Sequence, residues 1–457
     1  MNGPVLFRGG RVATADGPPV NADVLVRDGV FARIVAPGAP AIDAGAAEIT
    51  DISGLIMMPG AIDAHVHFRQ PGMTHKEDFA TGTAAAVCGG VTTTCDMPNT
   101  VPPVVDVERF MAKHDLVHDQ AYCDFGLWAG GTRTELFPEL KRAGAVGVKV
   151  FLNRSHRADD PYATELSMPD DATLRATFAA CAQADLLVAV HVGNPDAEER
   201  ARAELSAVSR TDARLVCRAY RNSGVLDSLR VVLRLARETG ARVHIAHVSL
   251  APTEAVDMIA ADRADGGTVT CECAPPALLE DDLDRLGAYG AAFAFPPEEA
   301  DFYWRALGDG RIDVVATDHA PHTRAEKDRG RTDVWAAPPG YPAVETSLPL
   351  MVDAALRGVM PLERVVRTMS TGPARLLGLP GKGTVSEGAD ADFVLLDPDG
   401  HAVIDESALH SKAGWSPFNG RKLLGRLSAT YLRGVRVAEN GDLLPGRALG
   451  QLVRPDR

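Results

Sequence analysis

Residues 61–68 read AIDAHVHF, an apolar run of strand length with two histidines in its second half. Seven similar runs, most of them rich in Val, follow between residues 91 and 321: VTTTCDMP, YCDFGLWAG, AVGVKVFL, LLVAVHV, RVHIAHVSL, TVTCECAP and IDVVATDHAP. Longer amphipathic stretches separate the runs, and several end in Gly, a common residue at the end of a helix. Eight strand–helix units predict the α/β fold class, with a parallel sheet that closes into a TIM-type (β/α)8 barrel.

The two ends of the chain have a different pattern. Residues 23–36 (DVLVRDGVFARIVA), 390–398 (DADFVLLDP) and 426–441 (RLSATYLRGVRVAENG) combine β-branched residues with Gly, Asp and Pro. Such segments are typical of short strands joined by turns. We therefore expect the barrel to occupy residues 56–380, between β-rich segments at residues 1–55 and 381–457.

Composition excludes several classes of protein. The 457 residues carry a formal net charge of −14, and 46% of them are hydrophobic and 24% charged. These fractions are ordinary for a globular protein, and the negative charge disfavours nucleic acids and anionic membranes as partners. No apolar run approaches the roughly 18–20 residues of a membrane span, and no signal-peptide pattern is present. Seven cysteines among mostly apolar neighbours predict reduced, buried thiols, so we expect a cytoplasmic protein: Cys88, Cys95, Cys123, Cys181, Cys217, Cys271 and Cys273.

Ionisable residues inside the apolar runs indicate the chemistry. Six of them lie near the C-terminal ends of predicted barrel strands: His65, His67, Lys149, His191, His247 and Asp318. Each alone has an ordinary explanation, as a core histidine, a lysine that reaches the surface, or an aspartate that caps a helix. Together in one barrel mouth they are costly to bury unless they are paired or bound to metal. Three or more histidines with an aspartate predict a first-row metal site.

A lysine among metal ligands needs its own explanation. The ammonium group of Lys149 has no lone pair and is repelled by a dication. A desolvated lysine can instead be neutral, and a neutral amine reacts with carbon dioxide to give a carbamate. That anion has two oxygens and is able to bridge two metals, so the six residues can hold two divalent ions.

Several segments resemble the signature sequences of the cyclic amidohydrolases: PGAIDAHVHFRQPG, DMPNTVPP, GVKVFL, HIAHVSL, ATDHAPH and ETSLPLM. Among these enzymes the dihydroorotases are the most similar, and the allantoinases and hydantoinases (dihydropyrimidinases) are relatives. The resemblance runs from Pro59 into the C-terminal β-rich segment. It implies that the two ends of the chain pair into one small β-sandwich beside the barrel.

The resemblance also implies roles for the six residues. His65 and His67 would bind the more buried metal, and His191 and His247 the other. Carboxylated Lys149 would bridge two divalent ions, most simply zinc. Asp318 would bind metal and act as the base that moves the proton during hydrolysis.

Three further residues match the dihydroorotase positions that hold a substrate carboxylate: Arg69, Asn99 and His322. A guanidinium fork, an amide and an imidazolium are all suitable donors to a carboxylate. In a purely structural alternative, Arg69 pairs with Glu77 or Asp78 in the next loop. Arg69 is not expected at this position in hydantoinases, so it favours an acidic ring over a plain hydantoin.

Three departures from the family pattern concern the rest of the pocket. Gly193 stands where a Glu normally follows the strand-five histidine, and Pro276 stands in a segment that normally reads Thr-Pro-His-His. Phe295 replaces an Asn that helps to hold the ring in dihydroorotases. Phe295 either changes the wall that faces the ring or only packs its own loop.

The expected function is metal-dependent hydrolysis of a cyclic amide and its reversal, most closely the conversion of L-dihydroorotate to N-carbamoyl-L-aspartate in pyrimidine metabolism. Alternatives are an allantoinase, a hydantoinase or a cyclic imide hydrolase, and a non-catalytic dihydroorotase-like subunit. The six intact ligand positions disfavour the last. Loops at residues 154–171 and 323–342 are expected at the barrel mouth. Expected partners are the cyclic amide substrate and further copies of the chain, as a dimer or tetramer.

Overall fold

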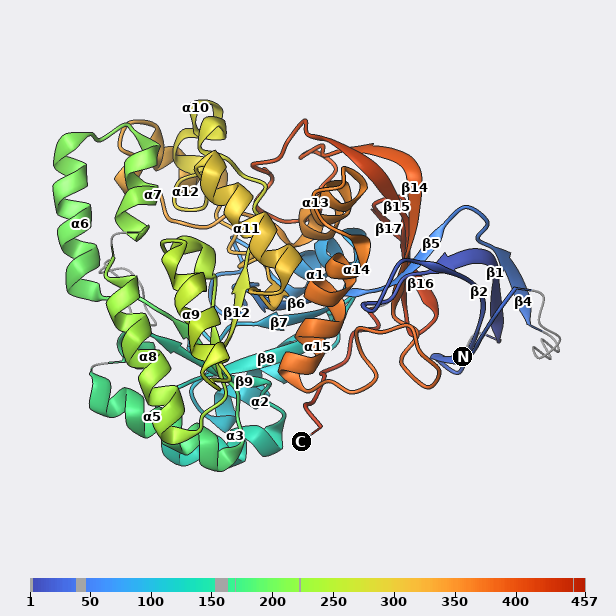
Figure 1. Cartoon of the computed structure of the whole chain (residues 1–457), viewed down its shortest axis with the longest axis horizontal. Helices are drawn as coiled ribbons and strands as arrows, with labels where there is room; N and C mark the ends of the chain where they lie inside the picture. The colour runs from blue at the N-terminus through green and yellow to red at the C-terminus, as the bar shows by residue number, and fades with distance from the viewer. Residues whose placement is uncertain are drawn as a thin grey trace.

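The computed structural model describes residues 3–37, 47–152, 163–168, 170–221, 223–446 and 448–456. Its larger part is the predicted barrel, which lies beside a sheet of blue N-terminal and red C-terminal strands in Figure 1. Each of the eight predicted runs contains one strand of a parallel sheet. The order is β13-β12-β11-β10-β9-β8-β7-β6, with bounds β6 Ala61–Val66, β7 Val91–Asp96, β8 Asp124–Gly130, β9 Gly147–Phe151, β10 Val188–His191, β11 Val243–Ile245, β12 Thr270–Cys273 and β13 Val314–Val315.

The C-terminal end of β6, the first strand, meets the segment just after β13, the last strand. Val66 forms a parallel bridge with His319, and the backbone N–H of His67 donates to the carbonyl of His319 over 2.8 Å. These contacts bring the segment after β6 and the segment after β13 together. The predicted barrel is therefore confirmed, with the two segments side by side at its mouth.

Helices surround the barrel, and local residues set their ends. Asp78 caps α1 by accepting a hydrogen bond from Thr81, and Gly240 ends α8 with a φ of 71°. A carboxylate satisfies free N–H groups at a helix start, and Gly adopts positive φ without a steric penalty. The helices are α1 Phe79–Cys88, α2 Val107–Val117, α3 Phe137–Ala143, α4 Ala163–Leu166, α5 Asp171–Ala184, α6 Pro195–Val208, α7 Ala213–Arg221, α8 Val225–Thr239, α9 Glu254–Ala264, α10 Leu283–Leu286, α11 Pro297–Asp309, α12 Arg324–Asp328, α13 Val344–Leu356, α14 Leu362–Val366 and α15 Gly372–Leu377.

The two ends of the chain pair with each other, as expected, and they form one nine-stranded sheet. Its order is β17-β16-β15-β14-β5-β1-β2-β3, with β4 also paired to β1. Stacked rings of Phe393 and Tyr431, with centroids 4.4 Å apart, belong to its separate apolar core. The strands are β1 Val5–Val12, β2 Val20–Arg27, β3 Val30–Val35, β4 Glu48–Asp51, β5 Ile56–Pro59, β14 Phe393–Val403, β15 Lys422–Leu432, β16 Val435–Glu439 and β17 Asp442–Leu443.

One connection of this sheet reaches the barrel mouth. Residues 404–421, the β14–β15 connection, carry Trp415, whose indole N–H donates to the carbonyl of His322 over 2.8 Å. Arg324 of α12 donates in turn to the carbonyl of Gly414. The end-built sheet thus supports the loop that follows β13.

Two other expectations concern the chain as a whole. All seven cysteines are free and buried, as predicted. Among the described residues, no helix combines the length and apolar character of a membrane span.

Of the two loops expected at the mouth, residues 323–342 follow β13 and include α12. Most of residues 154–171 lie outside the described residues.

Candidate active site

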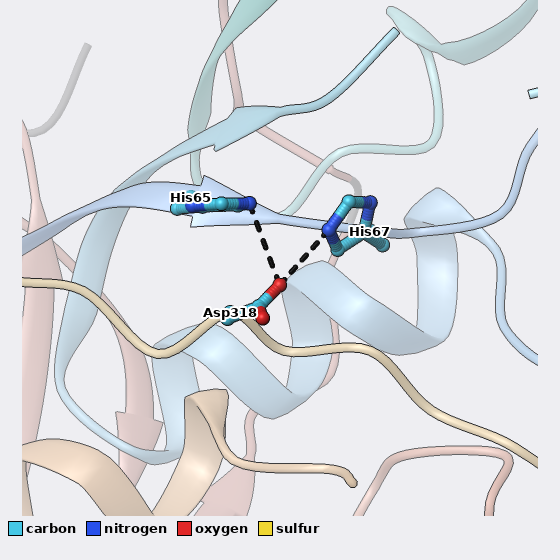
Figure 2. A group of neighbouring side chains, drawn as sticks. All are labelled: His65, His67 and Asp318. Atoms are coloured by element: carbon cyan, nitrogen blue, oxygen red, sulfur yellow. Dashed lines mark hydrogen bonds and ion pairs between the residues drawn. The ribbon is translucent and has the colours of Figure 1, made fainter. Parts of the chain in front are cut away.

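Two histidines and an aspartate form the centre of the barrel mouth. His65 lies on β6 and His67 lies two residues later, so alternation along the strand sends both rings to the same side. The Oδ1 atom of Asp318, three residues after β13, is 3.4 Å from Nε2 of His65 and 3.0 Å from Nε2 of His67 (Figure 2). All three residues are buried, and their ligand atoms lie within 4.8 Å of one another.

The other three predicted ligands adjoin this group. His247 follows β11, and its ring centroid lies 5.5 Å from that of His65 and 4.4 Å from that of His191. Lys149 of β9 is fully buried, and its Nζ has no hydrogen-bond partner among the described residues. Lys149 and Asp318 both act electrostatically on His191. The structure therefore brings all six predicted residues into one cluster.

Burial sets the charge states in this cluster. Desolvation lowers the pKa of His67 to about 4 and that of His247 to about 3, so both imidazoles are neutral at neutral pH. Desolvation also lowers the pKa of Lys149 to about 8, which makes a neutral amine accessible. Burial opposes the charge on Asp318, but His65 and His67 hold its pKa below its usual range.

This donor set fits divalent metal ions. Neutral imidazoles and an ionised carboxylate offer lone pairs to a shared point. The buried, unpartnered amine of Lys149 is costly as it stands, and conversion to a carbamate that binds metal removes that cost. The observed cluster is thus consistent with the predicted two-metal site.

The structure adds one residue that the sequence analysis missed. Glu272 of β12 places Oε1 2.5 Å from Nδ1 of His65 and Oε2 3.1 Å from Nε2 of His244. It also accepts the backbone N–H of His247 over 3.2 Å. A carboxylate on the far nitrogen of a ligand histidine fixes its tautomer and orientation. The available signal was that Glu272 is the only charged residue in TCEC and alternates with Cys271 and Cys273, so it points to the opposite face.

Three residues of the site hold strained backbone conformations. Positive φ angles occur at Arg69 (62°), His247 (35°) and Asp318 (49°). Such conformations cost roughly 1–3 kcal/mol for residues other than Gly and tend to occur at functional sites. Each turns the chain just after a barrel strand, where a side chain has to be directed across the mouth.

Arg69 and His322, two of the predicted carboxylate-binding residues, lie together. The Nη2 atom of Arg69 is 3.4 Å from Nε2 of His322, and Lys76 Nζ is 3.3 Å from Nδ1 of the same ring. Arg69 is 5% exposed, and its Nε lacks a hydrogen-bond partner in the described part of the chain.

In the structure, Glu77 and Asp78 have partners other than Arg69. Glu77 bonds Thr81 and Ser411 instead, and Asp78 bonds Lys412. Lys76 Nζ also pairs with Oε1 of Glu326 at 2.9 Å, and burial holds the pKa of His322 well below its usual value. Arg69 is therefore the cation that leaves donor capacity for an anion.

Asn99 has a contact that the sequence analysis did not anticipate. Its Oδ1 lies 2.8 Å from Nδ1 of His67, so the amide oxygen accepts the ring N–H. Asn99 therefore orients a candidate metal ligand, and its NH2 group remains a donor for substrate.

The structure places the three residues that depart from the family pattern, Gly193, Pro276 and Phe295, in different surroundings. Gly193 lines a small cavity beside His191 and His247, together with Glu198 and Tyr220. Pro276 is buried after β12. Phe295 is 3% exposed and packs on Tyr303 of α11, with ring centroids 5.3 Å apart. This setting agrees with the alternative in which Phe295 packs its own loop, because its ring belongs to the main apolar core.

Comparison with known proteins gives a consistent result. The model of the amidohydrolase family matches residues 56–437. An allantoinase of Rubrobacter xylanophilus is 36% identical over 461 residues, which cover 99% of this chain and 98% of the relative. A dihydroorotase of Halobacterium salinarum is 41% identical over 392 residues, or 83% of this chain and 86% of the relative. The solved L-hydantoinase (dihydropyrimidinase) of Arthrobacter aurescens superposes with a TM-score of 0.91 at 31% identity, covering 99% and 100% of the two chains.

Proposed function

Because the chain belongs to the amidohydrolase family and is a cyclic amide hydrolase, we propose that its substrate is a ring that carries a carboxylate. L-Dihydroorotate, opened to N-carbamoyl-L-aspartate, is the compound of this class that fits the residues best. The single observation that carries the proposal is the contact between Arg69 and His322 at the barrel mouth, with a buried Arg69 Nε that has no described partner. The 41% identity to the Halobacterium dihydroorotase supports it.

The proposed cofactors are two divalent ions, most simply zinc. His65, His67, His191, His247 and Asp318 would hold them, with a carbamate on Lys149 as a further ligand. When bound, such ions lower the pKa of a coordinated water to about 7 and polarise a carbonyl group. Supporting observations are the neutral histidines and the buried Lys149 amine.

Side chains of the protein would transfer the proton, bind the substrate and orient a metal ligand. Asp318 takes the proton of the attacking water and delivers it to the ring nitrogen that leaves. Arg69 and His322 hold the ring carboxylate by charge-assisted hydrogen bonds, and the NH2 group of Asn99 adds a donor. Glu272 keeps His65 in the required tautomer through the 2.5 Å contact.

The second candidate substrate class is the uncharged ring, allantoin or a hydantoin. It is favoured by the length of the similarity, since the Rubrobacter allantoinase matches over 99% of the chain and the Halobacterium dihydroorotase over 83%. For such a substrate the Arg69 side chain has no ionic partner, so its removal affects turnover little.

The test is a substrate comparison with metal-loaded protein. We expect ring opening of L-dihydroorotate that is lost in Asp318→Asn, and a KM that rises at least about tenfold in Arg69→Ala. Turnover of allantoin or hydantoins with none of L-dihydroorotate, and no effect of Arg69→Ala, would establish the second candidate. Protein that binds almost no metal and opens none of these rings would indicate the non-catalytic alternative.

A further inference from the structure

A second group of potential ligands lies outside the barrel-mouth cluster. It consists of Cys88 at the end of α1, Glu345 in the first turn of α13, and His410 in the β14–β15 connection. The Sγ atom of Cys88 is 3.6 Å from Nε2 of His410. Glu345 holds the same histidine twice, through its ring Nδ1 and its backbone N–H, each over 2.8 Å.

The Glu345 contacts define how the imidazole is used. A carboxylate on Nδ1 keeps the proton of neutral His410 there, so the lone pair of Nε2 faces the thiol. A histidine oriented in this way by a carboxylate is the usual arrangement of a metal ligand. Bond lengths of about 2.3 Å to sulfur and 2.0–2.1 Å to nitrogen place the two atoms about 3.6 Å apart around a tetrahedral zinc ion. The observed separation therefore needs no adjustment to admit one.

The surroundings supply access and further negative charge. Cys88 is 6% exposed, whereas the His410 side chain is 23% exposed and gives a route from solvent. Asp442 of β17, which is exposed, acts electrostatically on both Cys88 and His410. A cation at this point thus meets a thiol and an imidazole, and the carboxylates of Glu345 and Asp442 add negative charge nearby.

A second cluster of acidic side chains differs from this one, because a lysine already neutralises it. Asp124, Asp390 and Asp392 also lie close together, but Lys382 Nζ contacts all three, at 2.5, 2.8 and 2.6 Å. No lysine or arginine contact of this kind is found at Cys88 and Glu345 within the described ranges.

We propose that Cys88 and His410 bind a zinc-class divalent ion, with Glu345 orienting the imidazole and Asp442 contributing negative charge nearby. Binding replaces the thiol proton, which is released to water. The ion would join α1 to the β14–β15 connection, the segment whose Trp415 also supports His322. This site is separate from the barrel-mouth cluster and does not depend on the proposed substrate.

Cobalt provides a probe that separates the two sites. The barrel-mouth ligands are nitrogen and oxygen atoms, so a thiolate-to-cobalt charge-transfer band in the near ultraviolet reports on the cysteine site alone. Chelator-treated protein titrated with Co²⁺ is expected to develop this band and to saturate at one equivalent per chain. Glu345→Gln is expected to weaken that binding about 10–100-fold.

Variants identify the ligands. Cys88→Ser and His410→Ala should each abolish the band, and His410→Ala replaces a part-exposed side chain, so it serves if Cys88→Ser does not fold. Cys123→Ser is the matched control, because Cys123 is a buried thiol whose contact is Thr94 rather than a histidine. A band that survives Cys88→Ser, or no band once the barrel-mouth cluster is loaded, would overturn the proposal.

Discussion

The ring of His65 donates from Nδ1 to Oε1 of Glu272 over 2.5 Å, and this contact joins β6 to β12 across the barrel mouth. Glu272 also contacts His244 and the backbone of His247, so one carboxylate holds two candidate metal ligands. Desolvation opposes its charge, but His65 and His244 keep its pKa well below the usual value. It is therefore an anion that faces ligands rather than substrate.

Glu272→Gln is expected to weaken metal binding about 10–100-fold while the fold is kept. The amide preserves size but removes the charge that fixes the tautomer of His65. Metal content after dialysis against a chelator, and activity as a function of added Zn²⁺, would measure the effect. Full activity should return at high Zn²⁺. The matched control is Glu254→Gln on the exposed side of α9, and equal metal retention in both variants would contradict the prediction.

Asn99 allows the roles of orienting His67 and binding substrate to be separated. Asn99→Asp keeps an acceptor for the 2.8 Å contact with His67 but replaces the NH2 donor with negative charge. We expect metal content to stay near the wild-type value and KM for an anionic substrate to rise at least about tenfold. Asn99→Ala should lower both metal content and activity. If Asn99→Asp lost metal and left KM unchanged, Asn99 would not contact substrate.

The sequence was sufficient to predict the barrel and its six-residue cluster for a physical reason. Parallel strands bring their C-terminal ends together, and two-residue alternation puts His65 and His67 on one side. Other features depend on segments that meet only in the folded protein. The contact of Asn99 with His67 joins two loops, and Trp415 reaches His322 from a connection 93 residues later. Neither contact leaves a local pattern, and the packing of Phe295 on Tyr303 is equally a matter of tertiary structure.

Lys382 is expected to contribute strongly to stability. Its ammonium group contacts Asp124 of β8 and Asp390 and Asp392 beside the end-built sheet. Lys382→Met leaves buried carboxylates without this partner, so we expect a loss of about 3 kcal/mol in the free energy of unfolding at neutral pH. The surface pair of Lys141 and Asp185 is the control, and Lys141→Met should cost less than about 1 kcal/mol.

The Lys382→Met loss should also depend on pH in a defined direction. Burial already raises the pKa of Asp392, and removal of the ammonium group raises it further above the value in the unfolded chain. The native variant then binds more protons than the unfolded variant, so its stability relative to wild type recovers as pH falls toward about 4. Urea unfolding of both proteins between neutral pH and about pH 4 measures this difference in stability. A constant difference would show that the carboxylates are compensated by other groups, such as Arg433.

Lys327 should give a second pH dependence, at higher pH. Its fully buried Nζ donates to the carbonyls of Pro338 and Gly340 over 2.9 and 3.2 Å, within the loop that follows β13. Desolvation lowers its pKa from 10.5 to about 7. Between these two values the unfolded chain binds more protons than the native one, so this group makes the free energy of unfolding rise with pH.

Lys327→Met removes that contribution together with both hydrogen bonds. The stability of wild type relative to the variant is therefore expected to increase from about pH 7 upward, with a limiting slope of about 1.4 kcal/mol per pH unit, and to be flat below about pH 6. Urea unfolding of both proteins between about pH 6 and pH 9 provides the comparison, with the exposed Lys422→Met as control. A difference that stays constant over this range would mean that Lys327 remains charged in its buried position, held by the two carbonyls and the ring of Trp415 at 5.6 Å.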